Sequence, residues 1–198
     1  VSVGIFLFTL LIMVVPYRFA RSFIRKFAPK PRDIVLMQIL IVATMLIGKL
    51  FVLMGNLIAE KGLVPFRVFM FLIPLSAGTM MCRFVLNSES ALIYAMVSSL
   101  FAGLLLDGNL WFAGYTLIGS IVAAHCVAQA AQRTTILRAG LYAGAANAAM
   151  VVAFSAFQAE TTGRDFILGL TFALSSGLLS AMVVTAFTPA VEVRFGYI

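Results

Sequence analysis

Long runs of apolar residues, separated by short polar segments, make up most of this chain. The runs are about twenty residues long, which is the length a helix needs to cross a bilayer. They lack the apolar–polar alternation of strands in a membrane barrel. The pattern predicts seven helices, over residues 1–17, 34–59, 64–86, 90–106, 110–128, 136–158 and 166–187. Because the connecting segments are short, we expect successive helices to be antiparallel neighbours in one all-α transmembrane bundle.

Polar residues and prolines mark the breaks between the predicted helices. Several helices are preceded by side chains whose oxygens can accept from the free N–H groups of a first turn. These are Asp33, Ser88 with Glu89, Thr134 with Thr135, and Asp165. Pro74 lies inside the third predicted helix, and Pro189 is expected to end the seventh, because proline has no N–H to donate.

The first connector, residues 18–32, has its own pattern. Phe19, Phe23 and Phe27 recur at a spacing of four, so they share one face of a helix, with arginines and a lysine on its flanks. This pattern is typical of a short helix in the plane of the lipid headgroups. It also fits a basic membrane anchor whose aromatic residues are incidental, and the sequence leaves both alternatives open.

Composition supports the membrane assignment. Hydrophobic residues make up 63% of the chain and charged residues only 11%, whereas a soluble domain has about 25% charged residues. The net charge of +7 does not indicate nucleic-acid binding, because most basic residues lie between the apolar runs. Membrane topology and lipid headgroups explain basic residues in such places.

The basic residues also predict the orientation. Ten of them lie in alternate connectors on one side, and three lie on the other. The ten are Arg18, Arg21, Arg25, Lys26, Lys30, Arg32, Arg83, Arg133, Arg138 and Arg194, and the three are Lys61, Arg67 and Arg164. Because lysine and arginine accumulate on the cytoplasmic side, the N-terminus is predicted outside and the C-terminus in the cytoplasm.

The two ends of the chain suggest an excerpt of a longer protein. The chain begins at Val1, within an apolar run, and ends at Tyr197-Ile198 without a polar tail. The first run lacks the basic start and the small-residue cleavage site of a signal peptide. We therefore expect residues 1–198 to be one membrane domain, with a cytoplasmic module attached after Ile198.

Small residues predict where helices touch. Gly169, Ala173, Gly177 and Ala181 recur every four residues in the last predicted helix. The helix before it contains Gly140 and Gly144, and the fourth contains Ser99 and Gly103. Small side chains let helix backbones approach closely in lipid. We expect these positions to join helices within the bundle, while a homodimer contact through the same residues stays possible.

Polar residues within apolar runs are candidate site residues, because burying them in a membrane is costly. Lys49 lies about 24 Å along its helix from Asp33, and Asp107 at the outer end of the fourth helix is a candidate partner. The pair suggests a sensor pocket that faces outside, or a snorkelling lysine or structural ion pair. Asn56, Asn147 and Ser155 are expected to line the same interior or to form hydrogen bonds between helices.

No catalytic or cofactor motif stands out in the sequence. His125, the only histidine, adjoins Cys126, and neighbours in a helix point in different directions. A zinc site needs about four ligands, so this pair predicts no metal site. Cys82 and Cys126 lie in apolar runs, where we expect small core residues rather than a disulfide.

The C-terminal stretch carries a resemblance to a known family. A final membrane helix is followed by Pro189, Glu192 and then Phe195-Gly196, which is similar to the junction in seven-transmembrane HD-domain phosphohydrolases of the PgpH type. Residues 71–74, which open a run of small residues, and residues 133–140 fit the same membrane region. The resemblance covers most of the chain.

The resemblance implies a bacterial inner-membrane protein with an extracytoplasmic domain before the seven helices. A cytoplasmic HD domain, which hydrolyses cyclic di-AMP with a di-metal centre, would follow them. None of the metal ligands of such a centre is expected here, so this part would anchor the enzyme and relay a signal through its last helix. Two alternatives are a substrate-binding membrane subunit of a vitamin importer and a structural protein similar to the MreD type.

Overall fold

The computed structural model describes residues 2–24, 29–127, 133–157 and 163–195, and every regular element within these ranges is a helix. In chain order the elements are α1 (Ser2–Phe23), α2 (Pro31–Glu60), α3 (Phe66–Phe69), the 3₁₀ helix η1 (Met70–Leu72), α4 (Ser76–Val85), α5 (Ser88–Leu105), α6 (Leu110–Val127), α7 (Arg133–Phe157) and α8 (Gly163–Phe195). The predicted all-α fold is confirmed.

Six segments of the described chain are long and apolar enough to cross a membrane. They are α2, the segment from α3 through α4, α5, α6, α7, and α8 as far as Pro189. The six correspond to the second through seventh predicted helices. A seventh crossing by α1 and the orientation of the bundle stay predictions.

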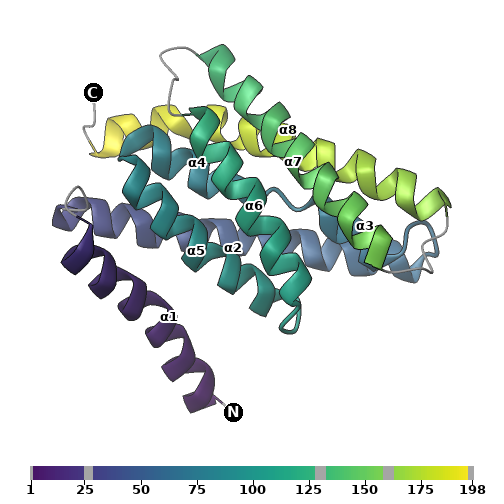
Figure 1. Ribbon diagram of the computed structural model, residues 1–198, viewed down its shortest axis with the longest axis horizontal. Coiled ribbons are helices and arrows are strands. Elements are labelled where there is room, and N and C mark those ends of the chain that lie inside the picture. Colours follow the sequence, from purple (N-terminus) through teal and green to yellow (C-terminus); the bar gives the residue numbers. More distant parts are fainter. Residues whose placement is uncertain (1, 25–28, 128–132, 158–162, 196–198) are drawn as a thin grey trace.

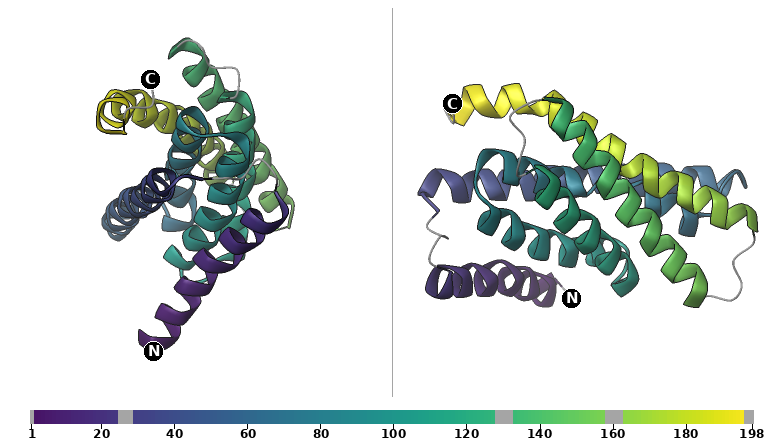
Figure 2. Two further views of the ribbon diagram at one scale, coloured as in Figure 1. Left: turned by 90° about the vertical axis from the view of Figure 1, so that its left-hand side faces the viewer. Right: turned by 45° about the horizontal axis from the view of Figure 1, so that its top comes forward.

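The helices α2 to α8 form the body of the bundle, and α1 stands off to one side (Figures 1 and 2). The start of α2 and the end of α8 lie at one end of the body, while α3 and the start of α8 lie together at the other (Figure 1). This arrangement agrees with helices that alternate in direction. It also places segments far apart in sequence, such as α3 and α8, side by side.

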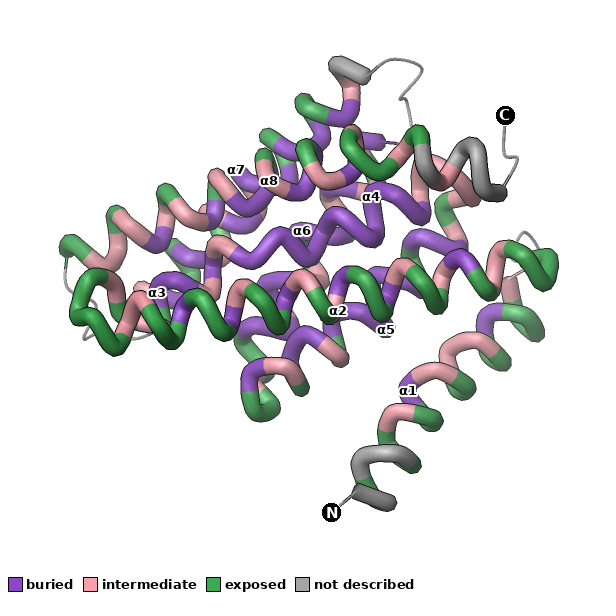
Figure 3. Tube along the Cα trace, turned by 180° about the vertical axis from the view of Figure 1, so that it is seen from behind, coloured by how far each residue is buried: buried purple, intermediate pink, exposed green. Residues whose placement is uncertain are grey.

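Burial is concentrated in the middle helices α4, α5 and α6, whereas α2 exposes one face along much of its length (Figure 3). That face carries Leu46, Leu50, Leu53 and Leu57, each at least half exposed. Because their spacing alternates between three and four residues, they form one stripe on the helix. In a bilayer such a stripe faces lipid, so its apolar side chains are not exposed to water.

The third predicted helix, residues 64–86, is wrong as a continuous element. The chain is helical in α3 and η1, becomes extended at Ile73, and is helical again in α4. Pro74 explains the break, because proline disfavours a helical conformation in the residue before it. In an unbroken helix the Leu75 N–H would donate to the Phe71 carbonyl, but it donates to the Ile73 carbonyl, at 3.0 Å.

The last predicted helix ends later than expected, since α8 continues past Pro189 to Phe195. Proline removes one backbone donor, a loss that contacts with a neighbouring helix can offset. Thr188 donates its hydroxyl to the Val184 carbonyl at 2.7 Å and approaches the sulfur of Met81 in α4 at 3.9 Å. Val191 packs on the buried cluster that contains Met81. Packing against α4 therefore holds the helix beyond the proline.

The end of α1 and the start of α5 also differ from the prediction. α1 continues through the start of the connector to Phe23, and Phe19 stacks on Phe23 with ring centroids 4.8 Å apart. The spacing of four therefore does place these rings on one face, while Phe27 lies outside the described residues. The cap of α5 is Asn87 and not Ser88 or Glu89, because its side-chain oxygen accepts from the Ser90 N–H at 2.8 Å.

The small-residue positions join α7 and α8 within the bundle. A Cβ atom added to Gly140 would lie 2.6 Å from the Gly177 carbonyl oxygen, and one added to Gly144 would lie 2.6 Å from the Leu174 carbonyl oxygen. Real Cβ atoms essentially never approach other atoms closer than 3.0 Å. The two backbones are in direct contact, as the sequence predicts for glycines that face each other.

Candidate functional site

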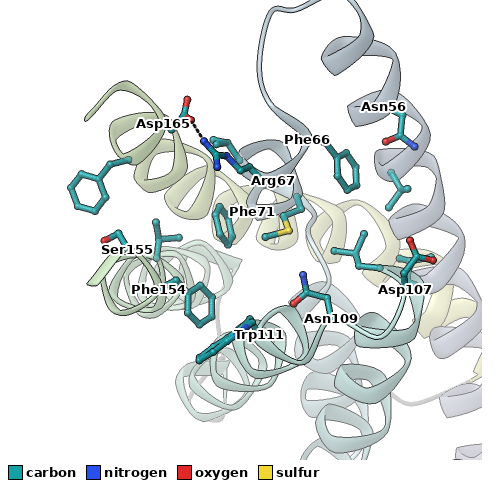
Figure 4. Close-up of a pocket in the computed structure, with 17 residues that line it drawn as sticks. Asn56, Phe66, Arg67, Phe71, Asp107, Asn109, Trp111, Phe154, Ser155 and Asp165 are labelled. Atoms are coloured by element: carbon teal, nitrogen blue, oxygen red, sulfur yellow. Dashed lines mark hydrogen bonds and ion pairs between the residues drawn. The ribbon is translucent and has the colours of Figure 1, made fainter. Parts of the chain in front are cut away.

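A cavity of about 450 Å³ lies at the end of the bundle where α2 ends and α8 begins (Figure 4). Its walls come from the second half of α2, from α3 and η1, from the turn between α5 and α6, and from the facing ends of α7 and α8. By the count of basic residues this is the predicted outer end. The volume falls in the range of about 300–1,000 Å³ typical of small-molecule sites.

The turn between α5 and α6 brings polar groups to the cavity. Asp107 and Gly108 both have positive φ, 55° and 82°, which lets the chain reverse direction within a few residues. The N–H groups of Gly108 and Asn109 donate to the Gly103 carbonyl at 3.0 and 3.1 Å. Asn109 then caps α6 by accepting from the Phe112 N–H at 3.0 Å. This geometry holds the side chains of Asp107 and Asn109 on the cavity wall.

An ion pair joins α3 to the first turn of α8 on the opposite wall. Arg67 Nη2 lies 2.9 Å from Asp165 Oδ2, and both residues line the cavity (Figure 4). The Asp165 side chain is 12% exposed and that of Arg67 is 56% exposed. The contact links residues 98 positions apart, so no local pattern in the sequence indicates it. It joins the broken third segment to the helix that leads to the other end of the bundle.

Aromatic rings form much of the remaining wall. Trp111 meets Phe154 edge to face with ring centroids 5.6 Å apart, and Phe71 stacks on Phe154 at 6.2 Å. Phe66 and Phe166 also line the cavity. Each ring belongs to a different element, which is why the sequence alone does not bring them together.

The predicted site residues divide between this cavity and other places. Asn56, Asp107 and Ser155 line the cavity, and Asn56 and Asp107 lie on the same side of it (Figure 4). Lys49 is exposed and is not among the lining residues. No ion pair between Lys49 and Asp107 is found in the described part of the chain, so the expected contact is wrong. Asp107 lies at a turn beyond the end of α5, on the cavity wall on the same side as Asn56, and Asn56 is about two turns further along α2 than Lys49.

Asn147 belongs to a separate polar cluster in the middle of the bundle. It is 4% exposed and its amide donates to Ser176 Oγ at 3.1 Å. Tyr115 lies 3.2 Å from the same oxygen and donates its hydroxyl to the Phe71 carbonyl at 2.7 Å. This is the carbonyl freed by the break before Pro74. The cluster therefore joins α6, α7 and α8 to the broken segment by hydrogen bonds, the alternative role expected for Asn147.

The other polar residues lie toward the opposite end. His125 is exposed near the end of α6, and Cys126 beside it is half-buried, whereas Cys82 is buried. Of the predicted output junction, Pro189, Glu192 and Phe195 belong to α8, and Gly196 lies outside the described residues. The functional use of this junction stays a prediction.

Comparison with known proteins adds the family to this geometry. The sequence model of one family, described as "7TM receptor with intracellular HD hydrolase", matches residues 1–198. The chain belongs to this family. No curated protein and no solved structure matches the chain closely enough to add to that assignment.

Membership of the 7TM receptor family confirms the resemblance found in the sequence. Together with six helical segments able to cross a membrane, it makes this chain a multi-pass membrane domain. It also sets aside the importer subunit and the cell-shape protein, which belong to other classes. The cavity lies in a domain that the family's description calls a receptor, and that description assigns it no ligand.

Proposed function

We propose that this chain anchors a bacterial HD phosphohydrolase in the inner membrane and relays a signal to it from outside the cell. The enzyme follows the C-terminus on the cytoplasmic side, and an extracytoplasmic domain precedes α1. The proposed substrate is cyclic di-AMP. This choice rests on the resemblance of the junction around Pro189 and Phe195 to that of seven-transmembrane HD-domain phosphohydrolases. In this account α1 is the first of seven crossings.

The course of α8 is the observation that carries this proposal. The helix begins at the cavity, where Asp165 and Phe166 are lining residues, and continues for 33 residues. At about 1.5 Å per residue this corresponds to roughly 50 Å, more than the thickness of a bilayer core. A single element therefore connects the cavity with the end where the hydrolase would be attached.

The contacts of α8 with α3 and α7 support movement of α8 as one rigid helix. Its first turn is joined to α3 by the ion pair between Arg67 and Asp165, and its middle packs on α7 through backbone contact. A shift at the cavity can reach the far end through a rigid helix of this kind, provided that the ligand favours one of two positions. The protein would then regulate hydrolysis through the position of its last helix.

The proposed relay is tested by cutting the covalent connection. A protease site is inserted after Ile198 in the whole protein, which is reconstituted in nanodiscs, and cyclic di-AMP hydrolysis is measured before and after cleavage. We expect cleavage to change turnover at least about threefold, a coupling of the size common between linked sites. The same protease added to protein without the site is the control. Equal turnover before and after cleavage would reduce the membrane domain to a tether.

A further inference from the structure

The cavity at the predicted outer end carries one carboxylate without an ionic partner. Three charged residues line it, and two of them, Arg67 and Asp165, neutralise each other at 2.9 Å. The third, Asp107, has no ion pair within the described ranges, and its side chain lies across the cavity from that pair (Figure 4). The lining therefore has a net charge of −1, which favours a ligand with a single positive charge.

The rest of the wall suits an apolar body joined to that charge. The rings of Phe66, Phe71, Trp111 and Phe154 line the cavity. A cation near the face of an aromatic ring is attracted by the ring quadrupole. Aromatic rings also stack with an aromatic or aliphatic group of the ligand. A purely polar cation would leave this apolar surface unused.

Two amide side chains near Asp107 can fix the orientation of a ligand. The Asn109 side-chain oxygen is already occupied by the Phe112 N–H, so its NH₂ group is left to donate toward a ligand. Asn56 lies on the same side as Asp107 (Figure 4). A few polar groups set against an apolar wall are typical of pockets that bind small molecules in one orientation.

We propose that this cavity binds small organic cations with an aromatic or aliphatic body, the ammonium group on Asp107 and the body against the rings. The inference deepens the proposed receptor function and rests on it for its biological role. Binding can be measured at the cavity itself, without measuring hydrolysis. The two proposals can therefore fail separately.

Trp111, the only tryptophan of the chain, lines the cavity and reports on binding. The probe is phenethylamine, added to the whole protein in phosphatidylcholine nanodiscs, with the Trp111→Phe variant giving the baseline for any other tryptophan. Phenethyl alcohol, which is neutral, and phenylacetate, which is negative, are the comparison compounds. We expect a saturable fluorescence change with the amine and at least about tenfold weaker binding of the alcohol, because a charged hydrogen bond is lost. Phenylacetate should produce no saturable change.

The variants separate the carboxylate from the fold of its turn. Asp107→Asn keeps a residue type that tolerates positive φ, so the turn should form, and it should remove the preference for amine over alcohol. Glu60→Gln is the matched control, because Glu60 is exposed at the same end of the bundle and does not line the cavity. This control should keep the preference.

Three results would overturn the cation site. The first is equal binding of amine and alcohol, and the second is an unchanged preference in Asp107→Asn. The third is a response that grows with lipid content and does not saturate at millimolar amine, which indicates partition into the bilayer. Saturable binding of the amine without a change in hydrolysis would support the site and count against the relay.

Discussion

Replacing Gly177 by alanine is expected to destabilise the bundle by about 3 kcal/mol, at the upper end of the usual cost of overpacking. The added Cβ atom would lie 2.7 Å from the Gly144 Cα, and backbone atoms cannot move aside as a flexible side chain can. The helices α7 and α8 would have to separate. Since about 1 kcal/mol shifts the melting temperature of a domain this size by roughly 2–4 °C, the expected fall is roughly 6–12 °C.

Gly114→Ala in α6 is the matched control for this prediction. A Cβ atom at Gly114 meets nothing within 4 Å. Alanine is a better helix former than glycine, so this variant should be unchanged or more stable by up to about 1 kcal/mol. Melting of both variants in the same mild detergent gives the comparison. Shifts of the same sign and size would contradict backbone contact between α7 and α8.

Tyr115→Phe is expected to destabilise the protein by about 1–3 kcal/mol, the cost of leaving buried polar groups without a partner. The variant removes the donor to the Phe71 carbonyl at the break in the third segment. It also removes the contact with Ser176 Oγ, while the ring and its packing stay.

Tyr142→Phe in α7 provides the matched control for the buried hydroxyl. Tyr142 is 61% exposed, so loss of its hydroxyl should change stability by no more than about 0.5 kcal/mol. Chemical denaturation of both variants, each compared with the unmodified protein, measures the difference. An equally small effect of Tyr115→Phe would mean that the Phe71 carbonyl needs no donor from α6.

Much of the fold could be predicted from the sequence because apolar runs and small residues act locally. A run of about twenty apolar residues satisfies its backbone groups within one helix, whatever its neighbours do. Glycines repeated every four residues, such as Gly140 and Gly144, mark one face of a helix that lets another helix backbone approach closely. The presence and order of the helices and the contact of α7 with α8 follow from these features.

The errors at the two prolines show where local rules stop. Pro74 interrupts its segment, whereas Pro189 stays within α8. The local cost of proline is the same in both cases, and the surroundings differ. Tyr115 supplies a donor at the break near Pro74, and contacts of Thr188 and Val191 with the α4 side hold the chain around Pro189.

The candidate site was only partly predictable for the same reason. Asn56 and Asp107 stand out as polar residues near apolar runs, and the structure brings both to the cavity. The ion pair between Arg67 and Asp165, and the contact of Trp111 with Phe154, join elements distant in sequence. A single sequence contains no signal for such pairs. It suggested Asp107 as a candidate partner of Lys49, and no ion pair joins these two described residues.

The central claim is that the cavity end faces outside and α8 ends in the cytoplasm, and cysteine labelling tests it most directly. Lys61, between α2 and α3, is exposed at the cavity end, and Ser88, at the start of α5, is exposed at the opposite end. That opposite end is where α8 finishes, since Thr188 contacts Met81 of α4. Each position is changed to cysteine in turn, with Cys82 and Cys126 replaced by alanine, and cells are treated with a membrane-impermeant maleimide.

The account predicts that Lys61→Cys is labelled in intact cells and that Ser88→Cys is labelled only after the membrane is permeabilised. Labelling of Ser88→Cys in intact cells, with Lys61→Cys protected, would contradict it. The cavity would then face the cytoplasm, and α8 could not deliver an outside signal to a hydrolase.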